Sequence, residues 1–153
     1  MDLSSTTYEL YRDIEPYVTG MLDLDGHHIM YWEISGNPEG VPIVFLHGGP
    51  GAGASLLHRR FFNPKYYKII IFDQRGSGRS RPFADITNNT TQYLVSDMET
   101  LRQYLGINKW MLFGGSWGSS LALAYGILHS ERVLGFILRG LFLCTRRELD
   151  WFL

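Results

Sequence analysis

The residue of this chain best suited to chemistry is a serine set between glycines. Residues 114–118 read GGSWG, which fits the pattern G-x-S-x-G. A serine hydroxyl is a weak nucleophile, so it must stand exposed at a sharp strand-to-helix turn, where a base can reach it. The apolar run before the motif predicts a strand, and the small-residue run SSLALAY after it predicts a helix whose N–H groups face developing negative charge. This context favours Ser116 as a nucleophile over a purely structural turn.

A second glycine-rich stretch, HGGPG at residues 47–51, follows the apolar run that begins at Val41. A loop at the carboxyl end of a buried parallel strand lies at the edge where open α/β sheets bind ligands. Its unobstructed N–H groups suit one half of an oxyanion hole, with the other half after the nucleophile. A tight turn is the alternative interpretation. His47 precedes the serine in an unusual order for a catalytic base, so we interpret it as a residue that braces the loop.

The rest of the chain alternates between strand and helix patterns. Apolar runs at 41–47, 67–73 and 132–139 predict strands, a D-G turn at 25–26 predicts a hairpin, and 55–66 predicts a short helix. Residues 88–91 should cap a helix that ends at Gly106, with Tyr93, Leu94, Met98, Leu101 and Leu105 on its core face. We therefore expect a doubly wound, mostly parallel α/β sheet of at least six strands whose first pairing is antiparallel. Residues 1–18 should form an arm over the sheet.

Other polar residues favour structural roles. His27 and His28 flank the hairpin turn and are expected to be solvated turn residues rather than metal ligands. The stretch 74–80 lacks the third glycine of a dinucleotide loop, and Asp73 and Arg75 are expected to brace it as an ion pair. Cys144 lies in an apolar run, which favours a buried, inert thiol.

Composition excludes several classes of function. The chain has 153 residues and a net charge of −1 with both signs interspersed, so neither nucleic acid nor a membrane surface is an expected partner. The longest apolar run, 133–144, is interrupted by Arg139 and shorter than the roughly 18 residues of a membrane span. No export signal is visible at the N-terminus, and the single cysteine excludes an internal disulfide, which together favour the cytoplasm.

Three motifs, HGGPG at 47–51, DQRGSGRS at 73–80 and GGSWGSSLALAY at 114–125, resemble the α/β-hydrolase superfamily. More narrowly they resemble proline iminopeptidases, which remove an N-terminal proline from peptides, and the stretch 138–152 is similar to the family sequence after the sixth strand. The resemblance implies that Ser116 is the nucleophile and that the backbone N–H groups of Gly49 and Trp117 form the oxyanion hole. It implies a peptide substrate with an N-terminal proline, no cofactor and no metal.

The sequence departs from the superfamily pattern after the nucleophile. There the triad runs Ser, Asp, His. His129 is the one histidine after Ser116 and lies about 20 Å along the helix at about 1.5 Å per residue, and no histidine follows Asp150. The family's helical cap is also missing. We therefore expect residues 1–153 to form the N-terminal part of an α/β-hydrolase core domain, truncated after about six strands, with cap and C-terminal strands absent.

Three functions remain open at this point. The first is a serine aminopeptidase of the proline iminopeptidase kind, and the second is another hydrolase of the superfamily that acts on esters or lactones. Ser116 argues against dehalogenases and most epoxide hydrolases of this fold, which carry an aspartate at the elbow. The third is a catalytically inactive truncated fragment, whose open sheet edge would promote self-association or pairing with a complementing C-terminal chain.

Overall fold

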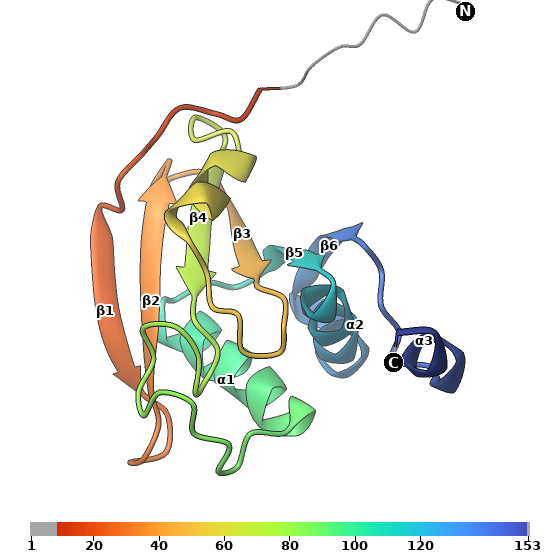
Figure 1. The fold of residues 1–153 in the computed structure, drawn as a ribbon. Coiled ribbons are helices and arrows are strands. Elements are labelled where there is room, and N and C mark those ends of the chain that lie inside the picture. Colours follow the sequence, from red (N-terminus) through yellow and green to blue (C-terminus); the bar gives the residue numbers. More distant parts are fainter. Residues whose placement is uncertain (1–8, 153) are drawn as a thin grey trace, which may run out of the picture.

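A computed structural model describes residues 9–152, with six strands forming one sheet in the order β1-β2-β4-β3-β5-β6 (Figure 1). Strand β1 (Val18–Asp23) pairs antiparallel with β2 (Ile29–Gly36), and β2 pairs antiparallel with β4 (Tyr67–Phe72). Strands β3 (Val41–Leu46), β5 (Trp110–Gly115) and β6 (Val133–Arg139) continue the sheet in parallel with β4. The expected architecture is confirmed: a mixed, mostly parallel α/β sheet whose first pairing is antiparallel.

Alternation along the central strands divides the core between the two faces of the sheet. Val44 and Leu46 of β3 point into one apolar cluster, whereas Ile43 and Phe45 point into another. Helices α1 (Thr91–Tyr104) and α2 (Trp117–Leu128) cover the first face. The short 3₁₀ helix η1 (Leu56–Phe61) covers the second face, so β3 is apolar on both sides as a central parallel strand requires.

The segment before β1 is tied to η1. The Tyr11 amide donates to the Arg60 carbonyl at 3.0 Å, and Arg59 reaches the Ile14 carbonyl at 3.4 Å. Ile14 itself packs against the apolar cluster on the η1 face. The predicted arm over the sheet is therefore present for residues 9–17, while its first eight residues lie outside the described chain.

Helix α1 follows its prediction with two adjustments. Leu94, Met98 and Leu101 are buried and Leu105 packs against them, but Tyr93 is exposed, where the Arg75 guanidinium lies 4.9 Å from its ring centre. The helix ends before Gly106, whose φ of +66° suits the predicted C-terminal cap. At the other end Thr90 occupies the N-cap position, and its side chain makes no capping hydrogen bond.

The C-terminal segment corrects the expectation for Cys144. Short 3₁₀ helix η2 (Ser130–Arg132) leads into β6, and a loop then reaches α3 (Arg146–Phe152). Cys144 lies in that loop, exposed and with a positive φ of 57°, so it is not a buried core thiol. Strand β6 ends at Arg139, so the rest of the apolar run, which includes Cys144, lies in the loop. Within the described residues, no helix is long and apolar enough to cross a membrane.

Candidate active site

Ser116 occupies a strained turn between β5 and α2. Its backbone angles are φ 54° and ψ −124°, and its side chain is exposed. A non-glycine residue at positive φ carries a conformational cost that persists only where the surrounding structure imposes it. The strain therefore arises from packing around the turn, and it presents the hydroxyl to solvent.

The glycines on either side make this packing possible. A Cβ added to Gly114 would lie 2.2 Å from the Gly118 carbonyl oxygen, and one added to Gly118 would lie 2.1 Å from the Leu46 carbonyl oxygen. Both are approaches of one backbone to another, which no side-chain rotation can relieve. The pattern G-x-S-x-G is thus a packing requirement that draws α2 against β3 and β5.

Hydrogen bonds then fix the turn to the segment after β6. The Ser116 amide donates to the Arg139 carbonyl at 3.0 Å. The Ser119 hydroxyl donates to the Ser116 carbonyl at 2.6 Å and accepts from the Phe142 amide at 3.1 Å, and the Ser120 hydroxyl donates to the Phe142 carbonyl. Two serines of α2 therefore hold the chain beyond β6 beside the nucleophile candidate.

The 47–51 loop lies directly against Ser116. A Cβ added to Gly48 would be 3.6 Å from the Ser116 Cβ, which leaves ordinary contact distance between the two turns. Gly49 has a φ of +118°, and a Cβ there would lie 2.5 Å from the Gly51 amide nitrogen. The fold thus places Gly48, the neighbour of Gly49, against Ser116, which directly precedes Trp117.

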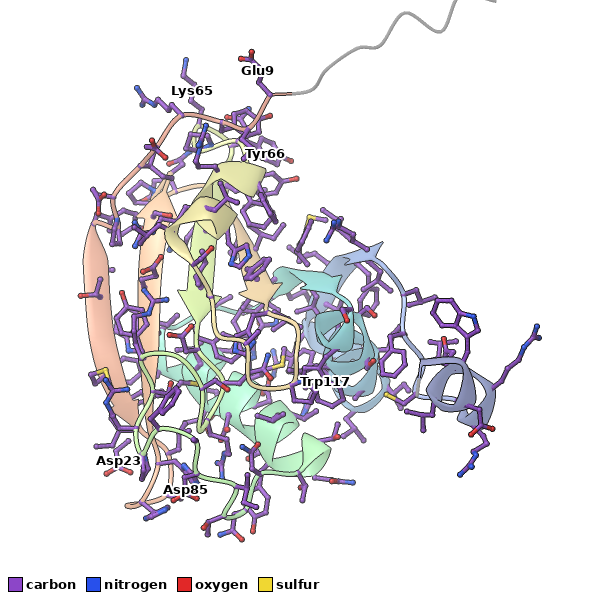
Figure 2. The ribbon with its side chains drawn as sticks, viewed as in Figure 1. Glu9, Asp23, Lys65, Tyr66, Asp85 and Trp117 are labelled. Atoms are coloured by element: carbon purple, nitrogen blue, oxygen red, sulfur yellow. The ribbon has the colours of Figure 1, made fainter. Side chains whose placement is uncertain are left out.

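His47 and Gln74 connect this loop to the nucleophile turn. The His47 Nε2 accepts from the Gln74 amide at 3.0 Å, and its Nδ1 lies 2.9 Å from the Gly48 carbonyl. The Gln74 side chain donates to the His47 carbonyl at 3.0 Å and accepts from the Trp117 indole at 3.0 Å. With both ring nitrogens engaged, His47 braces the loop, and burial lowers its pKa and keeps it neutral. Trp117 is the first residue of α2, and Figure 2 shows it beside the loop after β3.

Gln74 is a site residue that sequence reasoning missed. It lies two residues after the end of β4, at the same sheet edge as the 47–51 loop, and this position was the signal available. A glutamine can donate and accept at once, so it links the His47 carbonyl to the Trp117 indole in a way that an acidic residue would not.

Asp73 is the anchor of the following loop, but with a partner other than the one expected. Its carboxylate accepts from the Ala54 and Arg79 amides at 2.8 Å and from the Arg79 Nε at 2.8 Å. Burial alone would raise the pKa of Asp73, and these bonds lower it. Arg75 instead pairs with buried Asp97, at 2.6 Å and 2.7 Å, so the predicted Asp73–Arg75 ion pair is wrong. Sequence proximity is no guide to pairing where side chains leave a turn in opposite directions.

A cavity of about 630 Å³ opens beside this network. Pro50, Gly51 and Trp117 form one wall, and residues 83–86 form another. It has room for a peptide-sized group. Ser116 is outside its lining, so the cavity adjoins the nucleophile candidate without containing it.

None of the five histidines in the described residues hydrogen bonds to the Ser116 hydroxyl. His47 is engaged as above, the His58 Nδ1 accepts from the Ser55 amide at 2.9 Å, and His129 packs on Tyr125 at the far end of α2. His27 and His28 are both turned toward the loop after β4. The prediction of two solvated turn histidines is wrong for His28, which is fully buried.

Comparisons with known proteins identify a family and similar sequences. The sequence profile of the alpha/beta hydrolase fold family matches residues 41–152. The chain is 54% identical over 143 residues to a proline iminopeptidase of Arabidopsis thaliana, matching 94% of this chain and 38% of that one. It is 56% identical over 142 residues to a proline iminopeptidase of Neisseria meningitidis, matching 93% of this chain and 46% of that one. The chain therefore spans less than half the length of these relatives.

Solved structures give the same picture. A proline iminopeptidase-related protein of Thermus thermophilus aligns with a TM-score of 0.68 and 32% identity, over 79% of this chain and 43% of that one. A mutant of an epoxide hydrolase from Vigna radiata aligns with a TM-score of 0.71 and 25% identity, over 84% of this chain and 40% of that one.

The fold, the strained serine turn and the matching profile define the class: this chain belongs to the α/β-hydrolase family. Within that family it is similar in sequence to the N-terminal part of the proline iminopeptidases.

Proposed function

We propose that this chain supplies the nucleophile and oxyanion hole of a serine aminopeptidase that releases N-terminal proline from peptides. Ser116 attacks the carbonyl carbon of the prolyl residue, and the N–H groups of Gly49 and Trp117 stabilise the negative charge on its oxygen. The observation that carries the proposal is the exposed Ser116 at φ 54°, packed against the 47–51 loop. The identity of 54–56% to proline iminopeptidases supports the substrate class.

Acyl transfer also needs a base that takes the hydroxyl proton and returns it to the leaving amine. With no histidine bonded to Ser116 among residues 9–152, we propose that this base and its orienting carboxylate come from outside the 153 residues. Both would belong either to a further part of the same polypeptide or to a separate chain. The matched region covers 38% and 46% of these two relatives, so more than half of each relative lies outside the match and has room for such a part.

The exposed edge strand β6 favours the interpretation that a further segment or chain completes this sheet. Strand β6 pairs with β5 alone, and Leu134 and Phe136 are 53% and 42% exposed. Further along the chain, Leu141, Leu143 and Trp151 are also exposed. We propose that the remaining part of an α/β-hydrolase chain covers this surface. Self-association through the open edge is the competing outcome.

Two other functions stay in view. The first is hydrolysis of esters or lactones by the same nucleophile and oxyanion hole, because these substrates also react through a tetrahedral intermediate. An inactive fragment is the second, since without the base at most the contribution of the oxyanion hole survives. The structural likeness to an epoxide hydrolase concerns the fold, and the serine at the elbow favours acyl transfer.

Hydrolysis of a chromogenic prolyl amide by the purified 153-residue chain tests this assignment, with a chromogenic prolyl ester assayed beside it and Ser116→Ala as the control. We expect no amide turnover above the Ser116→Ala level by the chain alone. Turnover that the Ser116→Ala substitution abolishes would mean that a base within the chain reaches Ser116. Turnover of the ester alone would favour the esterase alternative.

A further inference from the structure

The turn between β1 and β2 is joined to the loop after β4 at one end of the molecule. Ile29 and Arg81 exchange two backbone hydrogen bonds of 2.8 Å. Beyond them, the His27 Nε2 lies 2.9 Å from an Asp85 oxygen, and the His28 Nε2 lies 2.7 Å from the Thr87 carbonyl oxygen. Figure 2 places Asp85 at the same end of the molecule as Asp23, where β1 runs into this turn.

His28 is held in the way that metal-binding histidines are held. Its partner at Nε2 is a carbonyl, which can only accept, so Nε2 carries the proton and Nδ1 carries the lone pair. The Nδ1 is buried and has no hydrogen-bond partner among the described residues. A buried acceptor without a partner is unfavourable, and ligating histidines commonly anchor their other N–H on a carbonyl.

Two further residues with possible ligand atoms stand beside the His28 ring. One ring nitrogen of His27, one of His28 and one carboxylate oxygen of Asp85 all lie within 4.8 Å of one another. In the described part of the chain this is the one group of three such residues so arranged. Asp85 also accepts from the Thr87 amide at 2.7 Å, which helps to hold its carboxylate in place beside His27.

We propose that His27, His28 and Asp85 form a binding site for a divalent transition-metal cation such as Zn²⁺ or Ni²⁺. Two imidazoles and a carboxylate suit these borderline cations, whereas Mg²⁺ prefers oxygen ligands and water. Ligands of a tetrahedral Zn²⁺ at about 2.0–2.2 Å are roughly 3.3 Å apart, so the widest pair in the group must close somewhat. The exposed side chain of His27 has the freedom to do this, and water would complete the coordination.

Such a cation would clamp the hairpin turn to the loop that walls the cavity. Asp85 is itself part of the cavity lining, so the site and the cavity share a residue. Metal binding would replace the hydrogen bond between His27 and Asp85. Without a metal, that hydrogen bond remains. This site goes beyond the hydrolase activity proposed above and does not depend on it.

Isothermal titration of the chain with ZnCl₂, prepared without a polyhistidine tag, tests the site directly. We expect saturable binding of one Zn²⁺ per chain, and little binding of MgCl₂ under the same conditions. The variants His27→Gln and Asp85→Asn change exposed or partly exposed side chains and should each weaken Zn²⁺ affinity by about tenfold or more. His129→Gln is the matched control and should bind as the unaltered chain does.

A thermal shift measurement tests the same site while leaving buried His28 intact. Zn²⁺ should raise the melting temperature of the unaltered chain and of His129→Gln, and should raise those of His27→Gln and Asp85→Asn less. Absence of saturable one-to-one binding would overturn the proposal and leave the three residues as a hydrogen-bonded contact. Binding of equal strength in all variants would also overturn it, since the cation would then sit elsewhere.

Discussion

Strands β4 and β6 have similar apolar sequences, YKIIIF and VLGFILR, and opposite surroundings. Strand β4 lies between β2 and β3, and its residues 69–72 are at most 1% exposed. Strand β6 lies at the edge, where Leu134 is 53% exposed. Burial is therefore decided by neighbours rather than by strand composition. Ser116 follows β5, on the boundary between the closed part of the sheet and its open edge.

Charged residues follow the same division. On the closed side, the Arg75 guanidinium and the Asp97 carboxylate are 2% and 4% exposed and joined by two hydrogen bonds. On the open side, Arg146 and Asp150 of α3 form an ion pair of 2.8 Å in which both side chains are largely exposed. Two ion pairs of similar length thus occupy very different dielectric surroundings, which makes them a matched pair for testing the comparison.

The largest effect is expected at the buried pair. Arg75→Met keeps much of the side-chain volume but leaves Asp97 without its main partner, so we expect a loss of about 3–5 kcal/mol in the free energy of unfolding. Arg146→Met should change it by less than about 1 kcal/mol, because exposed ion pairs contribute little. Urea unfolding followed by circular dichroism measures both. Similar losses in the two variants would remove the distinction between the closed and open sides.

A smaller effect is expected from the glycines. Gly118→Ala places a methyl group against the backbone of Leu46 and should destabilise the chain by about 3 kcal/mol. Gly135→Ala in β6 meets only the flexible end of Met111, at 3.6 Å, and should be nearly neutral. The same unfolding assay reports both. A Gly118→Ala variant as stable as Gly135→Ala would show that α2 is not held against β3 as described.

The smallest effect is a pH dependence. Two hydrogen bonds from Arg102, with a third from Tyr125, lower the pKa of Glu99 to about 2 from its ordinary value near 4.5. The unfolded chain therefore takes up this proton first as the solution is acidified, so stability present above about pH 5 is lost as the pH falls toward 2. Glu99→Gln should lose less stability over that range than the unaltered chain does.

Unfolding midpoints at pH 6 and pH 3 measure this difference. Asp150→Asn, which alters an exposed carboxylate of α3, is the control and should follow the unaltered chain. If Glu99→Gln keeps the full acid sensitivity, then the contacts of Glu99 with Arg102 and Tyr125 do not contribute to stability in the way the geometry indicates.

Short sequence patterns were enough to predict strands, turns and helix ends, because each of these depends mainly on neighbouring residues in the sequence. Strands β3 and β4 are apolar runs, the hairpin has its D-G turn, and a glycine of positive φ, Gly106, follows the end of α1. The turn at Ser116 was predictable for the same reason, because its glycines lie within two residues of the serine.

What escaped prediction depends on residues that meet only in the fold. Arg75 turns toward α1 and Asp97 rather than toward Asp73, and Gln74 connects two loops whose approach is fixed by the order of the strands. His28 looks like a turn residue in sequence and is buried because the loop after β4 folds over it. Cys144 lies in the loop after β6, where no element among residues 9–152 covers it.

The central claim is that Ser116 is the nucleophile of a site whose base lies outside this chain. Fusing the chain to the part of the Neisseria meningitidis relative that lies beyond the match, and assaying a prolyl amide, tests it most directly. The intact relative serves as the positive control. We predict that the fusion hydrolyses the amide and that Ser116→Ala lowers turnover by about 10³-fold or more. A folded fusion without turnover, or turnover that survives Ser116→Ala, would contradict the claim.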